Sequence, residues 1–84
     1  MLLPSQPVTL TVEQIGELNR QLSTMRHDVN NHLSLIVAAM ELIRHKPDTA
    51  ERMMTTLGEQ PPRIAQSIKN FSDEFERTMH ITRP

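Results

Sequence analysis

The sequence has no cysteine, tryptophan or tyrosine, and it has only two phenylalanines and two glycines in 84 residues. Without cysteine there is no disulfide framework, thiol nucleophile or zinc knuckle to consider. No apolar run approaches the roughly 18 residues that cross a membrane, and the segment Met1 to Pro4 lacks the basic and apolar regions of a signal peptide. We therefore expect a cytoplasmic protein with no membrane partner.

The chain also lacks an excess of charge of either sign. Nine Lys and Arg stand against ten Asp and Glu, dispersed along the chain, for a formal net charge of -1. No basic patch of the kind that binds nucleic acid is present, so we expect no nucleic-acid partner. A chain of this length holds one domain at most and leaves no room for a nucleotide-binding domain.

What the sequence does contain is a long helical pattern. Thr11 and Gln14 have the spacing of a capping box, which predicts a first helix at about 12–46 after a flexible N-terminal arm, 1–10. Apolar positions then recur in steps of three and four, which is the spacing of one helix face. They are Ile15, Leu18, Leu22, Met25, Val29, His32, Ile36, Ala39 and Ile43, of which His32 is the polar one.

A second helix follows a short connection. Pro47 ends the first helix, and Asp48 with Glu51 predicts another capping box, so the second helix is expected at about 49–80. Its apolar positions are Ala50, Met54, Leu57, Pro61, Ile64, Ile68, Phe71 and Phe75. Gly58 and the Pro61-Pro62 pair predict a kink near 58–62, with a break into two shorter helices as the alternative.

These two patterns predict an all-α fold. A connection of two or three residues forces residues 11–84 into an antiparallel two-helix hairpin. The apolar stripe is wider than one partner helix can cover, so we expect a homodimer in which two hairpins form a four-helix bundle. The sequence leaves open whether His32 is a buried polar group at the seam or leans to its edge.

His27 lies on the opposite side of the first helix from the apolar positions. With about 100° of rotation per residue, Val29 and Ile36 fall at about 200° and 180° from His27, whereas Asn31 falls at about 40°. The helix therefore presents an imidazole and a carboxamide to solvent. An exposed neutral imidazole is a competent nucleophile toward phosphorus, and the carboxylate of Asp28 could accept the other ring N–H. Metal binding is disfavoured because His27 and His32 lie about 140° apart and no cysteine joins them.

Apolar residues also occur on the His27 side, where an isolated helix would carry polar groups. Leu35, Ala38 and Leu42 fall within about 80° of His27 on the helical wheel. Counting back from the connection places residues between Gln60 and Arg63 at the level of Leu35. We therefore expect a docking surface that includes Leu35, Ala38, Leu42, Gln60 and Arg63.

The segment His27-Asp28-Val29-Asn30-Asn31-His32-Leu33 resembles the H-box of two-component sensor histidine kinases, whose usual form in this variant is H-D-F-N-N-x-L. The remainder, from Thr11 to His80, is similar to the dimerisation and histidine-phosphotransfer (DHp) hairpin that carries this box. The match departs from the usual form at Val29, where an aromatic residue is common, at His32, and in having no ATP-binding domain.

The resemblance implies roles for three residues. His27 would be the phosphoacceptor, Asp28 would help to activate it, and Asn31 would take part in removing phosphate from the partner. The implied partner is a response-regulator receiver domain that carries Mg²⁺, with a separate ATP-binding kinase subunit as a further candidate, while this chain itself binds no cofactor or metal. Besides phosphotransfer, the sequence permits a non-catalytic docking module or a plain helical scaffold.

Overall fold

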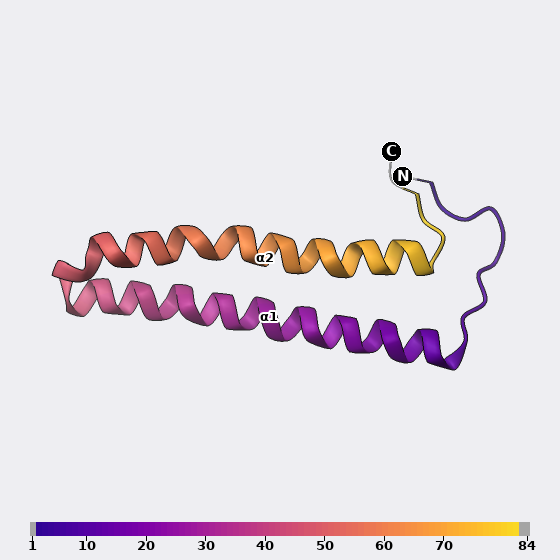
Figure 1. Cartoon of the computed structure of the whole chain (residues 1–84), viewed down its shortest axis with the longest axis horizontal. Coiled ribbons are helices and arrows are strands. Elements are labelled where there is room, and N and C mark those ends of the chain that lie inside the picture. Colours follow the sequence, from indigo (N-terminus) through magenta and orange to yellow (C-terminus); the bar gives the residue numbers. More distant parts are fainter. Residues whose placement is uncertain (1, 83–84) are drawn as a thin grey trace.

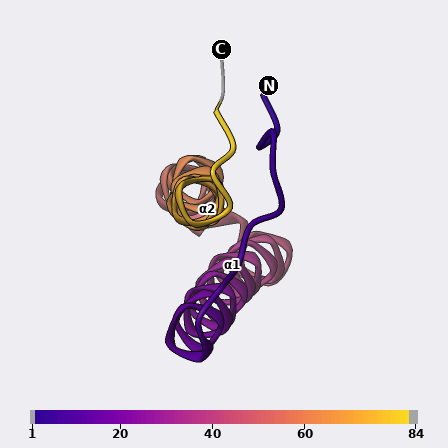
Figure 2. The ribbon, with the colours of Figure 1, turned by 90° about the vertical axis from the view of Figure 1, so that its right-hand side faces the viewer.

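Two long antiparallel helices joined by one tight turn make up the computed structural model, which describes residues 2–82 (Figure 1). Helix α1 spans Val12–His45, the 3-10 turn η1 spans Pro47–Thr49, and helix α2 spans Ala50–Thr78. The predicted all-α hairpin is therefore confirmed. Viewed from its open end, the hairpin is a single layer of two helices (Figure 2), and its extents are 58 × 28 × 12 Å.

Helix α1 begins at the predicted capping box. The Thr11 side chain accepts a hydrogen bond from the Gln14 backbone N–H at 3.1 Å, and the Gln14 side chain accepts one from the Thr11 N–H at 2.8 Å. Two of the N–H groups that a helix start leaves without partners are thus satisfied. At the other end, Arg44 and His45 put basic side chains in the last turn, where the helix dipole favours them.

The start of α2 differs from the prediction. Asp48 lies within η1, and no side chain caps α2 at its N-cap residue, Thr49. The predicted Asp48–Glu51 capping box is therefore wrong. Pro47 starts a 3-10 turn instead, and the Thr49 hydroxyl donates a hydrogen bond to the Lys46 carbonyl at 2.7 Å, which closes the turn.

Helix α2 continues through Pro61 and Pro62 without a break. A proline has no N–H to donate to the carbonyl four residues earlier, so the carbonyls of Leu57 and Gly58 lose their usual helical partners. Gly58 has nothing within 4 Å of where a Cβ would stand, so its small size is not required by packing. The alternative of two separate short helices is excluded.

The two ends of the chain meet at the open end of the hairpin. After α2, His80 adopts the left-handed conformation (φ 58°), and the Ile81 N–H returns to the Glu76 carbonyl at 2.8 Å, as in a Schellman motif. The chain then meets the arm, where Leu2 and Thr82 exchange backbone hydrogen bonds of 2.6 and 2.9 Å. The arm runs from the start of α1 past the end of α2, so that it and the segment after α2 both reach beyond α2 (Figures 1 and 2).

A polar pair lies in the middle of the seam between α1 and α2. His32 Nδ1 lies 2.8 Å from Gln60 Oε1, and the Gln60 amide N–H donates to the Thr56 carbonyl at 2.9 Å. Because the amide nitrogen is the donor, Oε1 is the acceptor and His32 Nδ1 carries the proton. Gln60 is 2% exposed, so this hydrogen bond is made inside the hairpin.

Very little of this hairpin is buried. Among residues 2–82, only Ala39 and Gln60 are buried, at 3% and 2% exposure. The accessible surface is 6441 Å², whereas a compact monomer of 9.7 kDa exposes about 5,100 Å². The radius of gyration is 18.1 Å, against about 12 Å expected for a compact chain of this length. The hairpin thus has a seam between two helices but no enclosed core.

Exposed apolar side chains gather on one face of the layer. On α1, Ile15, Leu33 and Met40 lie about 40–60° from Ile36 on the helical wheel, and on α2, Met54, Ile68 and Phe75 lie about 20–80° from Ile64 in the same rotational sense. Since the helices are antiparallel, equal rotation puts both sets on the same side of the hairpin. We call these six residues the apolar face. Within residues 2–82, neither helix is apolar enough over a sufficient length to traverse a bilayer.

The buried contact between His32 and Gln60 should contribute to stability. Gln60→Ala leaves the His32 Nδ1–H without its acceptor inside the hairpin, and should lower the free energy of unfolding by about 1–3 kcal/mol. Urea denaturation at fixed protein concentration measures the change. The exposed Gln66→Ala on the same helix is the control and should change stability by less than about 0.5 kcal/mol. Equal effects of the two substitutions would contradict a structural role for the pair.

Candidate functional site

His27 stands in the middle of α1 with its side chain 85% exposed. Its Nδ1 atom lies 3.7 Å from Asp28 Oδ1, which is beyond hydrogen-bond distance but close enough for electrostatic attraction when the ring carries charge. The Asp28 side chain is 48% exposed, so solvent weakens this attraction without removing it. Since Nδ1 faces the carboxylate, Nε2 is the ring nitrogen that is free to meet a reagent from solvent.

Uncharged polar side chains surround His27 on the surface of α1. Ser23 and Thr24 lie one turn before it, Asn30 and Asn31 lie one turn after it, and all four are exposed. Helical side chains lean toward the N-terminus of their helix. The Asn31 amide therefore leans over His27, and the imidazole leans over the two hydroxyls. Groups that donate and accept hydrogen bonds thus lie on both sides of the ring.

Arg20, two turns before His27, is already neutralised. Arg20 bonds to Glu17 through Nε at 3.0 Å and Nη2 at 2.5 Å, and Gln21 donates to the same carboxylate at 3.0 Å. The hydrogen bonds from Arg20, and then from Gln21, lower the pKa of Glu17 from 4.5 to about 2, and the same contact raises the pKa of Arg20. This pair stays ionised at neutral pH and adds no net charge beside His27.

Helix α2 contributes residues to the flank of the site that the sequence analysis missed. A small hollow between the helices is lined by Thr24 and Asp28 of α1 and by Ser67 and Asn70 of α2, with Gln21, Met25 and Phe71 around them. Asp28 therefore faces polar groups of both helices. The short connection could have predicted these residues. Asp28 lies about as many residues before the turn as residues 67–70 lie after it, so the antiparallel hairpin brings them to the same level.

The predicted docking residues are only partly on one surface. Leu35 is 40% exposed, Ala38 and Arg63 are exposed, and Leu42 is half-buried. Gln60 is not at this surface, because its side chain turns into the seam to meet His32. Arg63 Nη2 lies 3.6 Å from Glu59 Oε2, so Arg63 forms an ion pair with a residue one turn earlier in α2.

A shallow apolar depression does lie on α1 just beyond the histidine. It is lined by Leu33, Val37 and Ala38, with Asn30 and Ser34 at its border. Leu33 and Val37 are 46% and 60% exposed, and neither was predicted as a docking residue. On the helical wheel Leu33 lies about 120° from His27, and Val37 lies about 80° from it on the side opposite Leu35. The depression begins one turn after His27 and joins the site to the apolar face.

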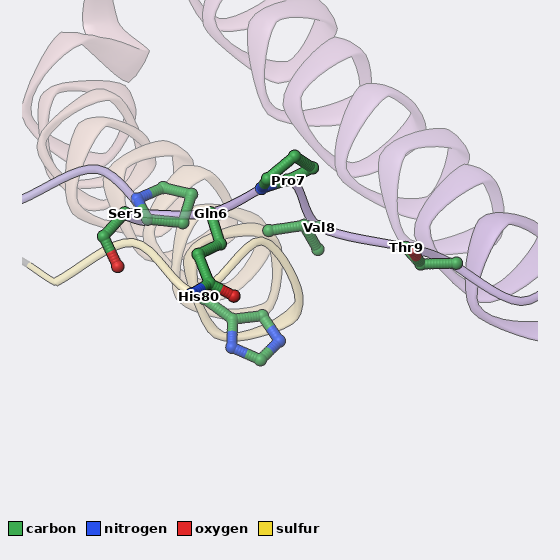
Figure 3. Close-up of a pocket in the computed structure, with 7 residues that line it drawn as sticks. Ser5, Gln6, Pro7, Val8, Thr9 and His80 are labelled. Carbon is green, nitrogen blue, oxygen red and sulfur yellow. The ribbon is translucent and has the colours of Figure 1, made fainter.

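A second hollow lies at the open end of the hairpin, lined by arm residues between Pro4 and Thr9 and by His80 (Figure 3). The start of α1 is about 22 Å from His27 along the helix, so this hollow is separate from the histidine site. Within residues 2–82 no three His, Cys, Asp or Glu side chains gather as metal ligands would. No protein-family model, curated protein or solved structure matches the chain.

Proposed function

We propose that the chain is a phosphorelay hairpin in which His27 accepts a phosphoryl group and exchanges it with the aspartate of a response-regulator receiver domain. The supporting observation is the 85% exposure of His27 within H-D-V-N-N-H-L, on the side of α1 that faces away from the seam. A phosphoryl donor needs room for in-line approach, for its metal ion and for the leaving group. An imidazole exposed in this way provides that room.

The contact with Asp28 supports a particular course of transfer. With the proton on Nδ1, the Nε2 lone pair attacks phosphorus while the bond from phosphorus to the receiver's aspartate oxygen breaks, and the electron pair stays on that oxygen. Positive charge develops on the ring during the attack. Asp28 Oδ1, 3.7 Å from His27 Nδ1, attracts that charge. The Mg²⁺ ion expected on the receiver would supply charge neutralisation at the phosphoryl oxygens.

Asn31 is placed to take part in a second reaction, hydrolysis of the receiver's phosphoaspartate. Its amide leans over His27 from the next turn and carries both a donor and an acceptor. Such a group can orient a water molecule toward the receiver's phosphoaspartate once the receiver is docked. Removal of phosphate from the receiver is therefore part of the proposed role of Asn31.

The apolar face supports assembly into a homodimeric four-helix bundle. Its six residues are 37–60% exposed in the single hairpin. Phe75 also packs against Phe71, with the two tilted rings 5.9 Å apart between centroids. A second hairpin related by a two-fold axis would cover this face and create the core that one layer lacks. His27 faces away from α2 and remains accessible in such a bundle.

The phosphoryl group would come from a separate ATP-binding kinase subunit or from a phosphorylated receiver. In a longer kinase, the same histidine would be the site of autophosphorylation. The alternative function is a docking module that binds receivers or kinases without phosphotransfer. It is favoured by the apolar depression of Leu33, Val37 and Ala38, which could hold a partner whether or not His27 reacts.

Incubation with a labelled phosphoreceiver and Mg²⁺ tests the relay. We expect acid-labile label on the wild-type hairpin and none on His27→Gln, because the nucleophile is lost. His45→Gln, which removes another exposed histidine of α1, is the matched control and should be labelled normally. Label that persists on His27→Gln would remove the site assignment, and binding without label would support the docking module.

The dimer is tested on the apolar face. Ile68→Lys puts a charge where Ile68 would be covered, and should raise the dimer dissociation constant at least about tenfold, because an unpaired charge is costly to bury. Sedimentation equilibrium measures the constant. Gln66→Lys, two residues away on the opposite side of α2, should leave it unchanged. A monomeric wild type, or an Ile68→Lys dimer of unchanged affinity, would rule this interface out.

Receiver docking is tested at Leu35. Leu35→Ala should weaken receiver binding by at least about fivefold, as loss of a central apolar contact does, without changing the melting temperature. Titration calorimetry and thermal unfolding provide the two measurements. Val12→Ala, an exposed truncation at the start of α1, is the control. If Leu35→Ala instead destabilises the hairpin at unchanged affinity, Leu35 is a packing residue.

A further inference from the structure

Arg26, the residue before His27, is an exposed arginine without an acidic partner. Four other arginines of the described chain pair with a glutamate three or four residues earlier in their own helix: Arg20, Arg44, Arg63 and Arg77. Arg26 cannot do so, because the residues three and four positions away are Leu22, Ser23, Val29 and Asn30. Within residues 2–82 it makes no ion pair, so its guanidinium has all five donors available.

The charges around His27 leave a negative charge that the Arg26 guanidinium could offset. Glu17 and Arg20 neutralise one another, which leaves the Asp28 carboxylate as the unpaired charge on the other side of the ring. A phosphoryl group brings close to two negative charges, which Asp28 repels. Unless a cation offsets that repulsion, the carboxylate that favours the ring also disfavours the group that the ring must accept.

We propose that Arg26 binds the phosphoryl oxygens on His27, during transfer and in the phosphohistidine. This inference rests on the proposed function. The Cα atoms of Arg26 and His27 are about 3.8 Å apart, and the two side chains leave α1 about 100° apart, an angle that a long arginine can cross. Asp28 leaves on the other side of His27, so the guanidinium approaches phosphorus from the side opposite the carboxylate.

The position of Arg26 relative to the apolar face adds to this role. Arg26 precedes Leu33 by seven residues, so it lies on the border between the histidine and the apolar face. In a dimer its aliphatic stem can rest on apolar neighbours while the charged end stays at the rim. A second hairpin would limit the access of water to this rim, which strengthens a charge-assisted hydrogen bond to phosphate. The fork of the guanidinium also matches two phosphoryl oxygens at once.

Labelled phosphoramidate, a small phosphoryl donor, allows a test that needs no receiver. The Nε2 lone pair of His27 attacks phosphorus, and the phosphorus–nitrogen bond of the reagent breaks. The nitrogen leaves with the bonding electron pair and, with a proton taken from solvent, becomes ammonia. We expect Arg26→Gln to lower the rate of His27 labelling by about tenfold, the effect of losing one charge-assisted bond. Arg26→Lys should recover part of the rate, since it keeps the charge and loses the fork.

Arg52→Gln is the matched control, because Arg52 is also exposed and without an ion pair but lies near the turn. It should be labelled like wild type. Added salt should slow the wild type more than Arg26→Gln, an effect that a purely structural role would not produce. Wild-type rates in Arg26→Gln, or an equal loss in Arg52→Gln, would overturn the inference.

The relay and the arginine can fail separately. If phosphoramidate labels His27 but a phosphoreceiver does not, the relay is contradicted and the Arg26 comparison still decides the inference. If phosphoramidate leaves His27 of the wild type unlabelled, both proposals are contradicted. Sedimentation of Arg26→Gln checks that the oligomeric state is unchanged.

Discussion

The rotation of about 100° per residue along α1 is the constraint on which the rest of the structure depends. It places Val29 and Ile36 on the seam with α2 and turns His27 almost directly away from them. The packing residues and His27 are thus interleaved in sequence but separated in space. Substitutions on the seam can therefore alter stability while the environment of His27 stays that of an exposed helix surface.

A single layer of two helices has consequences on both of its faces. One seam cannot cover apolar stripes as wide as these, so Ile68 and Phe75 stay exposed together with Leu33 and Met40 of the other helix. The same thinness keeps His27 accessible, since nothing in the hairpin lies above it. Exposure of the histidine and exposure of the apolar face both follow from this geometry.

The His32–Gln60 pair is an exception within a seam of apolar residues. It joins the helix that carries His27 to α2 close to the Pro61-Pro62 pair, where two helical hydrogen bonds are missing. A polar contact at one level of an apolar seam favours a single register, because sliding by one turn would leave both groups without partners. Register in turn determines which residues of α2 lie beside Asp28.

Much of the fold could be predicted from local sequence. The Thr11–Gln14 box, the three-four spacing and Pro47 were sufficient for the helix bounds and the hairpin, because each acts within a few residues. The same spacing predicted that His27 is exposed. The Asp48–Glu51 box failed because Pro47 began a 3-10 turn, which moved the start of α2 from the expected residue 49 to Ala50 and took Asp48 out of the capping position.

The sequence by itself determined which residues share a helix face, since helical rotation requires only local backbone geometry. Tertiary structure alone decided which residues of the two helices meet. It turned Gln60 inward to His32 when the docking surface had been expected to include it, and it brought Ser67 and Asn70 beside Asp28. The physical reason is that contacts between helices depend on their register and on the way each side chain turns at the seam, and neither is encoded in the spacing along a single helix.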